Sequence, residues 1–203
     1  MKNRLITVYA SLDALPSLQA RYGSQLSDYR IQKCARLKNA ADRDRGMLAE
    51  YCLIEALTRA GIPVSLPLRI GTEALQKPFL LDRTVEFSLS HAGDYAAAAV
   101  CDLPVGVDIE RTRPVTDALA ERISTETEVQ TVWLPARTGE TFRDLFSAKE
   151  SIVKRSGEGL RALCTVDTTE DKTVRQMHFA DYVLSVSTES EAVWEVFRCE
   201  KGF

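Results

Sequence analysis

Gly106-Val-Asp108-Ile-Glu110 and Phe146-Ser-Ala-Lys149-Glu150-Ser-Ile-Val-Lys154 are the two stretches that say most about this chain. The first predicts a β-strand, in which residues two apart point to one face, so Asp108 and Glu110 lie side by side. The second predicts a helix, where Glu150 and Lys154 share a face because they are four residues apart. Three carboxylates and an ammonium group favour Mg²⁺-dependent chemistry on phosphates, because the metal neutralises phosphoryl oxygens and the lysine adds a fixed positive charge.

Each motif taken alone also has an ordinary structural explanation. The chain has 29 acidic residues, so a pair at a strand end arises by chance, and Arg111 and Arg113 could balance its charge. The Glu150–Lys154 spacing is that of a common surface salt bridge, worth a few tenths of a kcal/mol. In favour of a site, a Gly157-Glu158-Gly159 turn follows the helix and could bring backbone N–H groups close to an anion.

Length and composition set the class of protein. The 203 residues suffice for one large domain or two small ones, and a net charge of −3 argues against a strongly basic nucleic-acid binder. Five widely spread cysteines without a C-x-x-C pair argue against disulfides and zinc, which favours a reducing cytoplasm. The sequence shows neither a signal peptide nor a membrane span. We therefore expect a soluble cytoplasmic protein that binds neither nucleic acid nor membrane.

The order of elements predicts an α+β fold of two similar lobes. Each lobe is a long helix packed on a small, mostly antiparallel sheet, and the lobes cover residues 1–103 and 104–203 in a pseudo-two-fold arrangement. The two helices are expected from about Asn39 to Ala60 and from Thr138 to Arg155. Strands are expected at 4–9, 85–90, 95–100, 105–110, 176–179, 182–187 and 193–198. Residues 85–90 alternate apolar and polar, and hairpins are expected at Gly93-Asp94 and between the last three strands.

Ser90 and His91 stand together at the end of a predicted strand. A serine hydrolase pairing fails on geometry, because neighbouring strand residues point to opposite faces. His91 is either an ordinary surface residue or a donor to a phosphate. His178 alternates with apolar neighbours, which favours a structural role.

Six stretches stand in a fixed order along the chain: Ala41-Asp-Arg-Asp-Arg45, Lys77-Pro78, Phe87-Ser-Leu-Ser-His91, Gly106–Glu110, Phe146–Lys154 and Gly157-Glu-Gly-Leu160. Taken in order, these motifs resemble those of the Sfp-type (surfactin-type) 4′-phosphopantetheinyl transferases over most of residues 36–167. The chain differs from that family's usual pattern at three positions, where it has Phe146 for tryptophan, Ala92 for serine and Glu158 for a basic residue.

The resemblance implies a monomer that binds coenzyme A at the seam between two lobes, with Mg²⁺ on the pyrophosphate. The reaction would move 4′-phosphopantetheine to a serine of an apo acyl or peptidyl carrier protein and release 3′,5′-ADP. Glu150 would accept the serine proton, directly or through a water on the metal. By position, the metal ligands are Asp108, Glu110 and Glu150, the catalytic residues are Glu150, Lys154 and Asp108, and the coenzyme-binding residues are Arg45, Lys77, Ser90, His91 and Lys154, with Arg43 as a companion.

Two other functions fit the same residues. A Mg²⁺-dependent phosphohydrolase would use the acidic cluster on water, and a degenerate relative would bind coenzyme A or a carrier protein without catalysis. The retention of Asp108, Glu110, Glu150 and Lys154 argues against the second. An acidic carrier protein is expected as partner, and residues 111–122 and 124–137 are plausible parts of its docking surface.

Overall fold

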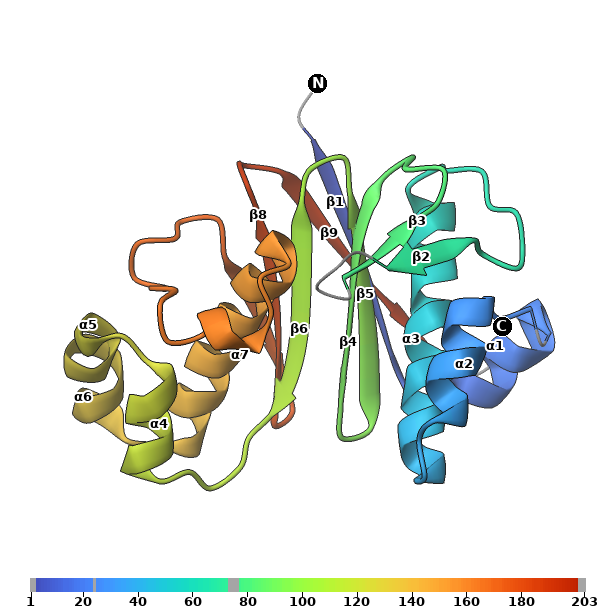
Figure 1. Ribbon diagram of the computed structural model, residues 1–203. Coiled ribbons are helices and arrows are strands. Elements are labelled where there is room, and N and C mark those ends of the chain that lie inside the picture. Colours follow the sequence, from blue (N-terminus) through green and yellow to red (C-terminus); the bar gives the residue numbers. More distant parts are fainter. Residues whose placement is uncertain (1–2, 24, 73–76, 201–203) are drawn as a thin grey trace.

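The computed structural model describes residues 3–23, 25–72 and 77–200, and its two long helices flank two central sheets (Figure 1). The predicted α+β class is confirmed. The helices are α1 (Leu15–Tyr22), α2 (Asp28–Ala35), α3 (Ala40–Arg59), α4 (Asp117–Ile123), α5 (Glu126–Glu128), α6 (Leu134–Ala136) and α7 (Gly139–Ser156), with 3₁₀ turns η1 (Leu12–Ala14) and η3 (Leu160–Ala162) and a π-helical turn η2 (Val129–Trp133). The strands are β1 (Arg4–Ser11), β2 (Ile70–Thr72), β3 (Pro78–Leu80), β4 (Glu86–Ala92), β5 (Tyr95–Cys101), β6 (Val105–Arg111), β7 (Arg175–Phe179), β8 (Tyr182–Thr188) and β9 (Val193–Cys199).

The two long helices begin at side-chain caps. The Asn39 side chain accepts a hydrogen bond from the backbone N–H of Ala41 at the start of α3, and Thr138 accepts one from Thr141 at the start of α7. Gly157 ends α7 in the left-handed region at φ 77°, which glycine adopts without a Cβ clash. Both predicted helices are therefore confirmed to within one residue at each end.

The sheets repeat one order of strands. The first sheet runs β4-β5-β1-β9 and the second β6-β8-β7, so β1, α3 and the β4–β5 hairpin have the same order as β6, α7 and the β7–β8 hairpin. Alternation of side chains divides β1 between two cores: Ile6 and Val8 pack against α3, whereas Leu5 and Tyr9 pack between the two sheets. The pseudo-two-fold relation of the lobes remains a prediction.

The last strand corrects the predicted topology. β8 and β9 do not form a hairpin, because β9 leaves the second sheet and pairs in parallel with β1, Leu5 opposite Trp194 and Val8 opposite Phe197. Alternation of apolar and polar residues sets the face that a strand presents, but it carries no information about the partner strand. The division at residues 103 and 104 stays a prediction, and β9 crosses it.

Candidate active site

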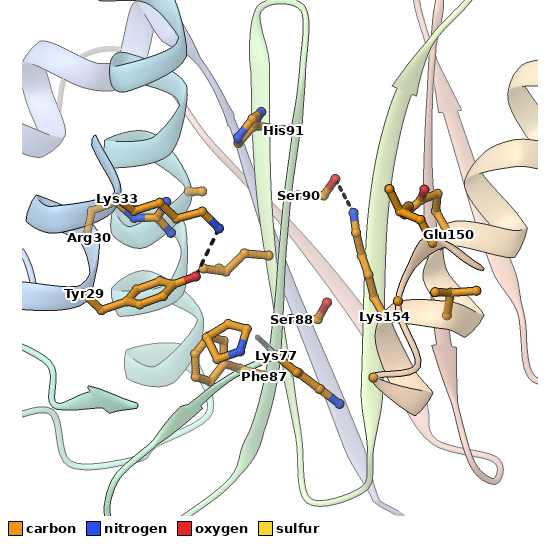
Figure 2. Close-up of a pocket in the computed structure, with 17 residues that line it drawn as sticks. Tyr29, Arg30, Lys33, Lys77, Phe87, Ser88, Ser90, His91, Glu150 and Lys154 are labelled. Atoms are coloured by element: carbon orange, nitrogen blue, oxygen red, sulfur yellow. Dashed lines mark hydrogen bonds between the residues drawn. The ribbon is translucent and has the colours of Figure 1, made fainter. Parts of the chain in front are cut away.

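A cavity of about 350 Å³ lies at the seam between the two lobes (Figure 2). Side chains from α2, β4 and the start of β3 form its N-terminal side, and α7 with the turn after it forms the opposite side. Five of the predicted coenzyme-binding and catalytic residues line it, and they are Lys77, Ser90, His91, Glu150 and Lys154.

Two serines join the lobes at the floor of this cavity. The Ser88 hydroxyl accepts a hydrogen bond from the backbone N–H of Val107 at 3.0 Å, and that of Ser90 accepts one from Ile109 at 3.3 Å. β4 and β6 thus lie side by side at the edges of different sheets, and side-chain oxygens satisfy backbone donors that a β-ladder would otherwise use. The register between the lobes is therefore set by these two hydroxyls.

Asp108 and Lys154 meet at the Ser90 hydroxyl. Lys154 Nζ lies 2.6 Å from Asp108 Oδ1 and 2.9 Å from Ser90 Oγ, and Ser90 donates to the same Asp108 oxygen at 2.8 Å. The simple explanation of a Glu150–Lys154 surface salt bridge is thus not what the structure shows, because the cation bonds across the seam of β6 and α7. Asp108 Oδ2 is buried and has no hydrogen-bond partner among the described residues.

A glycine lets α7 approach β6 closely enough for this contact. A Cβ on Gly106 would lie 1.8 Å from the carbonyl oxygen of Ser151 and 2.6 Å from the backbone nitrogen of Arg155. Gly106 and Asp108 are two residues apart, so both face α7, whereas Val107 points into the core between the sheets. The close approach brings Lys154 to the Asp108 carboxylate.

The other two predicted metal ligands, Glu110 and Glu150, are carboxylates whose pKa values are raised. Burial and the nearby Asp108 charge raise the pKa of Glu110 to about 7, although Arg113 and Lys154 oppose the shift. Burial also raises the pKa of Glu150, against the effect of Lys154. Arg111 is not the partner of this cluster, since it pairs with Asp181 at 2.6 Å.

Within residues 3–23, 25–72 and 77–200, no three His, Cys, Asp or Glu side chains lie close enough together to form a ready metal site. The donor set nevertheless suits a hard divalent cation, because these are oxygen ligands with excess negative charge. The unpartnered Oδ2 of Asp108 is a coordination position that no protein donor uses. The three carboxylates therefore fit Mg²⁺ in chemistry, while their assignment as ligands stays a prediction.

His91 lies at the rim of the cavity on the face of β4 opposite to Ser90. Partial burial of the ring and the positive charges of Arg30, Arg45 and Lys154 lower the pKa of His91 to about 4. The imidazole is therefore neutral at pH 7 and can donate one N–H to an anion. Arg45 does not line the cavity, and it instead contacts Asp42 and the carbonyl oxygen of Gly93.

Two further basic residues from the matching motifs have structural partners. Lys77 Nζ donates to the carbonyl oxygen of Arg155 at 2.8 Å, and so connects the first lobe to the end of α7. The Arg43 guanidinium donates to the carbonyl oxygens of Leu37 and Lys38, outside the cavity. The structure thus brings Lys77 into the site and leaves Arg43 away from it.

Three cavity residues on α2 escaped the sequence reasoning, namely Tyr29, Arg30 and Lys33. The Arg30 guanidinium is buried beside Glu50, with Nε 3.5 Å from Oε2, and Lys33 Nζ donates to the Tyr29 hydroxyl at 3.1 Å. A signal exists in the sequence, because Arg30 and Lys33 are three residues apart after Ser27, a residue type that often caps helices. That helix has eight residues and a weak apolar stripe, so its pattern is faint.

Comparisons with known proteins show what this sequence is similar to. Residues 104–196 match the model of the 4′-phosphopantetheinyl transferase superfamily. The chain is 29% identical over 143 residues to the 4′-phosphopantetheinyl transferase Sfp of Bacillus subtilis (strain 168), which is 69% of this chain and 64% of that protein. It is 40% identical over 92 residues to 4′-phosphopantetheinyl transferase psf-1 of Bacillus pumilus, covering 44% of this chain and 40% of psf-1.

The chain is thus similar to 4′-phosphopantetheinyl transferases, and the predicted resemblance to the Sfp-type members of that superfamily is confirmed. A third relative, gsp of Aneurinibacillus migulanus, is 28% identical over 68% of this chain and 58% of its own. The chain therefore spans somewhat less than two thirds of the length of Sfp. The described residues contain no helix long and apolar enough to span a membrane, and the five cysteines are free thiols.

Proposed function

We propose that the protein is a 4′-phosphopantetheinyl transferase that moves 4′-phosphopantetheine from coenzyme A to a serine of an apo acyl or peptidyl carrier protein. The support is the composition of one cavity. Cationic groups from α2 and from Lys77 face a cluster of one cation and one carboxylate on α7, with Asp108 directly behind it. Such a cavity suits a ligand that carries phosphates at one end and reacts at another.

The basic residues would bind the coenzyme. Arg30 is fixed by its contact with Glu50, so it offers a preorganised cation, whereas Lys33 is exposed and mobile enough to follow a phosphate. Lys77 and the neutral N–H of His91 add further donors to the cavity. We expect Arg45 to act indirectly, through its contact with the Gly93 carbonyl in the turn after β4.

The transfer itself breaks one bond and forms one. The carrier serine Oγ attacks the β-phosphorus of coenzyme A, the bond from that phosphorus to the bridging oxygen breaks, and 3′,5′-ADP leaves. Lys154 is placed to stabilise the charge that develops on the pyrophosphate oxygens. Mg²⁺ held by Asp108, Glu110 and Glu150 would supply further charge neutralisation when bound.

Glu150 is the candidate acceptor of the serine proton. Its side chain lines the cavity, and burial raises its pKa, which makes it a stronger base than an ordinary glutamate. Lys154, one turn further along α7, favours the ionised form and so keeps Glu150 able to accept a proton. A Glu150→Gln variant that binds coenzyme A and turns over at the normal rate would exclude this role.

Intact-protein mass spectrometry of an apo carrier protein incubated with this protein, coenzyme A and Mg²⁺ tests the proposal. We expect a gain of one phosphopantetheinyl group that disappears with a chelator and with Asp108→Ala. Tight coenzyme A binding without transfer to any of several carriers would instead identify a non-catalytic binder. Release of hydrolysis products in the absence of a carrier would identify a phosphohydrolase.

A further inference from the structure

Lys149 and Glu128 form an ion pair that is completely buried. Both side chains have 0% exposure, and Lys149 Nζ lies 2.5 Å from Glu128 Oε2. Lys149 precedes the site residue Glu150 on α7, but it does not line the cavity and points to the other side of the helix. Two buried charges are costly to remove from water, so the pair calls for an explanation beyond packing.

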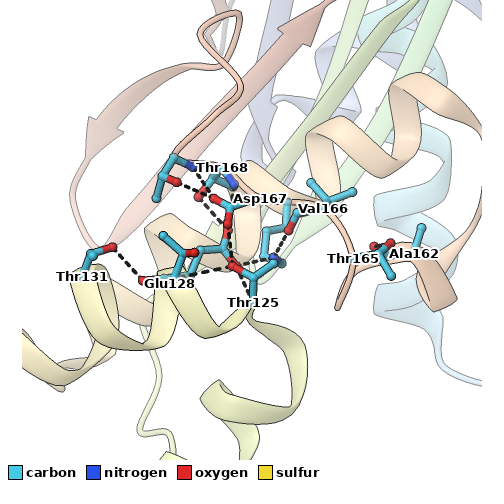
Figure 3. A network of polar contacts seen from close by, with 11 residues as sticks. Thr125, Glu128, Thr131, Ala162, Thr165, Val166, Asp167 and Thr168 are labelled. Carbon is cyan, nitrogen blue, oxygen red and sulfur yellow. Dashed lines mark hydrogen bonds and ion pairs between the residues drawn. The ribbon is translucent and has the colours of Figure 1, made fainter.

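Glu128 is the centre of a network that ties three segments together (Figure 3). Its Oε1 accepts hydrogen bonds from the backbone N–H and the hydroxyl of Thr168, both at 2.8 Å. Its Oε2 accepts from the backbone N–H of Thr125 at 2.9 Å, and Thr125 Oγ1 donates to Asp167 at 2.7 Å. Lys149 also donates to the carbonyl oxygen of Val166. The network thus fastens residues 166–168 to the middle of α7.

Residues 157–168, here named the return loop, run back along α7 to reach this network. The loop starts at Gly157, which caps the helix, and ends beside Lys149, eight residues earlier and about 12 Å back along the helix axis. Ala162 and Leu163 in its middle pack on Val153. Its crest lines the cavity through Gly157, Gly159 and Leu160, and Leu160 is 67% exposed.

The crest is held by local contacts: the Gly157 N–H donates to the carbonyl oxygen of Val153, and the Ala162 N–H donates to that of Gly159. Gly157 and Gly159 both have positive φ, at 77° and 79°, and among the described residues nothing except its chain neighbours lies within 4 Å of the position of a Cβ on Gly159. Because glycine permits a wide range of φ and ψ angles, a segment with two glycines can adopt many backbone conformations. The packing of Ala162 and Leu163 on Val153 and the fixed end of the loop at residues 166–168 therefore limit the positions of the crest together.

We propose that Lys149 and Glu128 are positioning residues whose buried pair anchors the return loop and thereby holds Gly157, Gly159 and Leu160 as one wall of the coenzyme cavity. The inference rests on the proposed function only in taking coenzyme A as the ligand. Lys149, the neighbour of Glu150 in the motif, would thus position the cavity wall without contacting the substrate.

The test separates positioning from simple stability by removing both charges. Lys149→Met alone leaves a buried carboxylate without a counter-charge, and its Tm should fall by about 10 °C or more. Lys149→Met with Glu128→Leu leaves no unpaired buried charge, and Thr168 is partly exposed, so water can replace its lost partner. The double variant should therefore recover most of the lost Tm.

Hydrogen exchange and coenzyme A binding are then measured on the double variant. We expect amides of the return loop to exchange at least ten-fold faster while those of β6 keep their protection, and coenzyme A to bind about ten-fold more weakly. Unchanged exchange and affinity at the recovered Tm would overturn the proposal and leave the pair a purely stabilising role. If wild-type protein failed to bind coenzyme A, the proposed function would fail, and the exchange data alone would still decide this inference.

Two further variants keep the test sound. Glu55→Gln is a matched control, because Glu55 is a buried carboxylate on the equivalent helix α3, bonded to Tyr22 and Arg21 and outside the cavity. It should lower Tm without changing exchange in the return loop. Thr168→Val removes one hydroxyl from the network and serves if the double variant fails to fold. Return-loop exchange should then increase several-fold, and an unchanged rate would contradict the anchor.

Discussion

Lys154 Nζ lies 2.6 Å from Asp108 Oδ1, so a cation and an anion from two different elements form an ion pair at the cavity. α7 supplies the lysine, β6 supplies the aspartate, and the Ser90 hydroxyl of the other lobe bonds to both. One contact therefore reports whether α7, the second sheet and the first lobe are correctly placed together.

Lys154→Met should lower turnover by about 10²–10³-fold, the usual effect of removing one group that stabilises transition-state charge. It should also cost about 1–3 kcal/mol of stability, because Asp108 is left buried without its partner. The checks are kcat in the carrier assay and unfolding in urea. Adding Asp108→Asn should restore stability but not turnover, and recovery of both would show that the pair acts only in folding.

Gly106→Ala should destabilise the fold by about 3 kcal/mol or more, because the new methyl group would overlap backbone atoms of α7 that cannot move independently. Unfolding in urea measures the loss. Ser187→Ala is the matched control, since Ser187 lies opposite Gly106 in the β6–β8 ladder and its buried hydroxyl has no partner in the described part of the chain. That change should be neutral or slightly stabilising, and an equal loss in both variants would refute the close-approach argument.

Lys33→Ala should raise the KM for coenzyme A about ten-fold and leave kcat nearly unchanged, because a flexible cation at the cavity binds ground state and transition state alike. The salt dependence of KM should become weaker, since one charge contact is lost. Lys38→Ala, an exposed lysine just beyond α2 and away from the cavity, provides the comparison. Similar effects from both would mean general attraction rather than a specific contact.

His91 should make the fold less stable in mild acid. Its pKa is about 4 in the folded protein and 6.5 when unperturbed, so between these values the unfolded chain binds a proton that the folded protein does not. Unfolding therefore becomes easier as pH falls from about 6.5 towards 4. His91→Gln should reduce this pH dependence, as measured by Tm from pH 7 to pH 4.5. A parallel decline in both proteins would locate the acid sensitivity elsewhere.

The fold could be predicted as far as its elements are locally encoded. Asn39 and Thr138 mark helix starts through their own side chains, and β4 and β5 could be recognised from alternation in β4 and from the Gly93-Asp94 turn between them. The parallel pairing of β9 with β1 could not be predicted, because it joins residues almost 190 positions apart. Nothing in a strand's own alternation specifies such a partner.

The site was predictable where a motif places its residues on one face of one element. Spacing alone puts Asp108 and Glu110 together, and likewise Glu150 and Lys154. The contact of Lys154 with Asp108 depends on the distance between β6 and α7, which is short because Gly106 has no side chain against the α7 backbone at Ser151 and Arg155. The cations of α2 stayed unnoticed because their helix is short and their position in the cavity depends on how α2 packs on α3.

The place of β9 has a consequence for the order in which the molecule can be made. β1 pairs with β5 on one side and with β9 on the other, so one edge of the first sheet stays open until residues 193–199 have left the ribosome. An open edge is prone to wrong pairing during synthesis. The first sheet of the nascent chain is thus completed only when the last strand has been made. A truncation before residue 193 would remove β9 and so damage the N-terminal lobe.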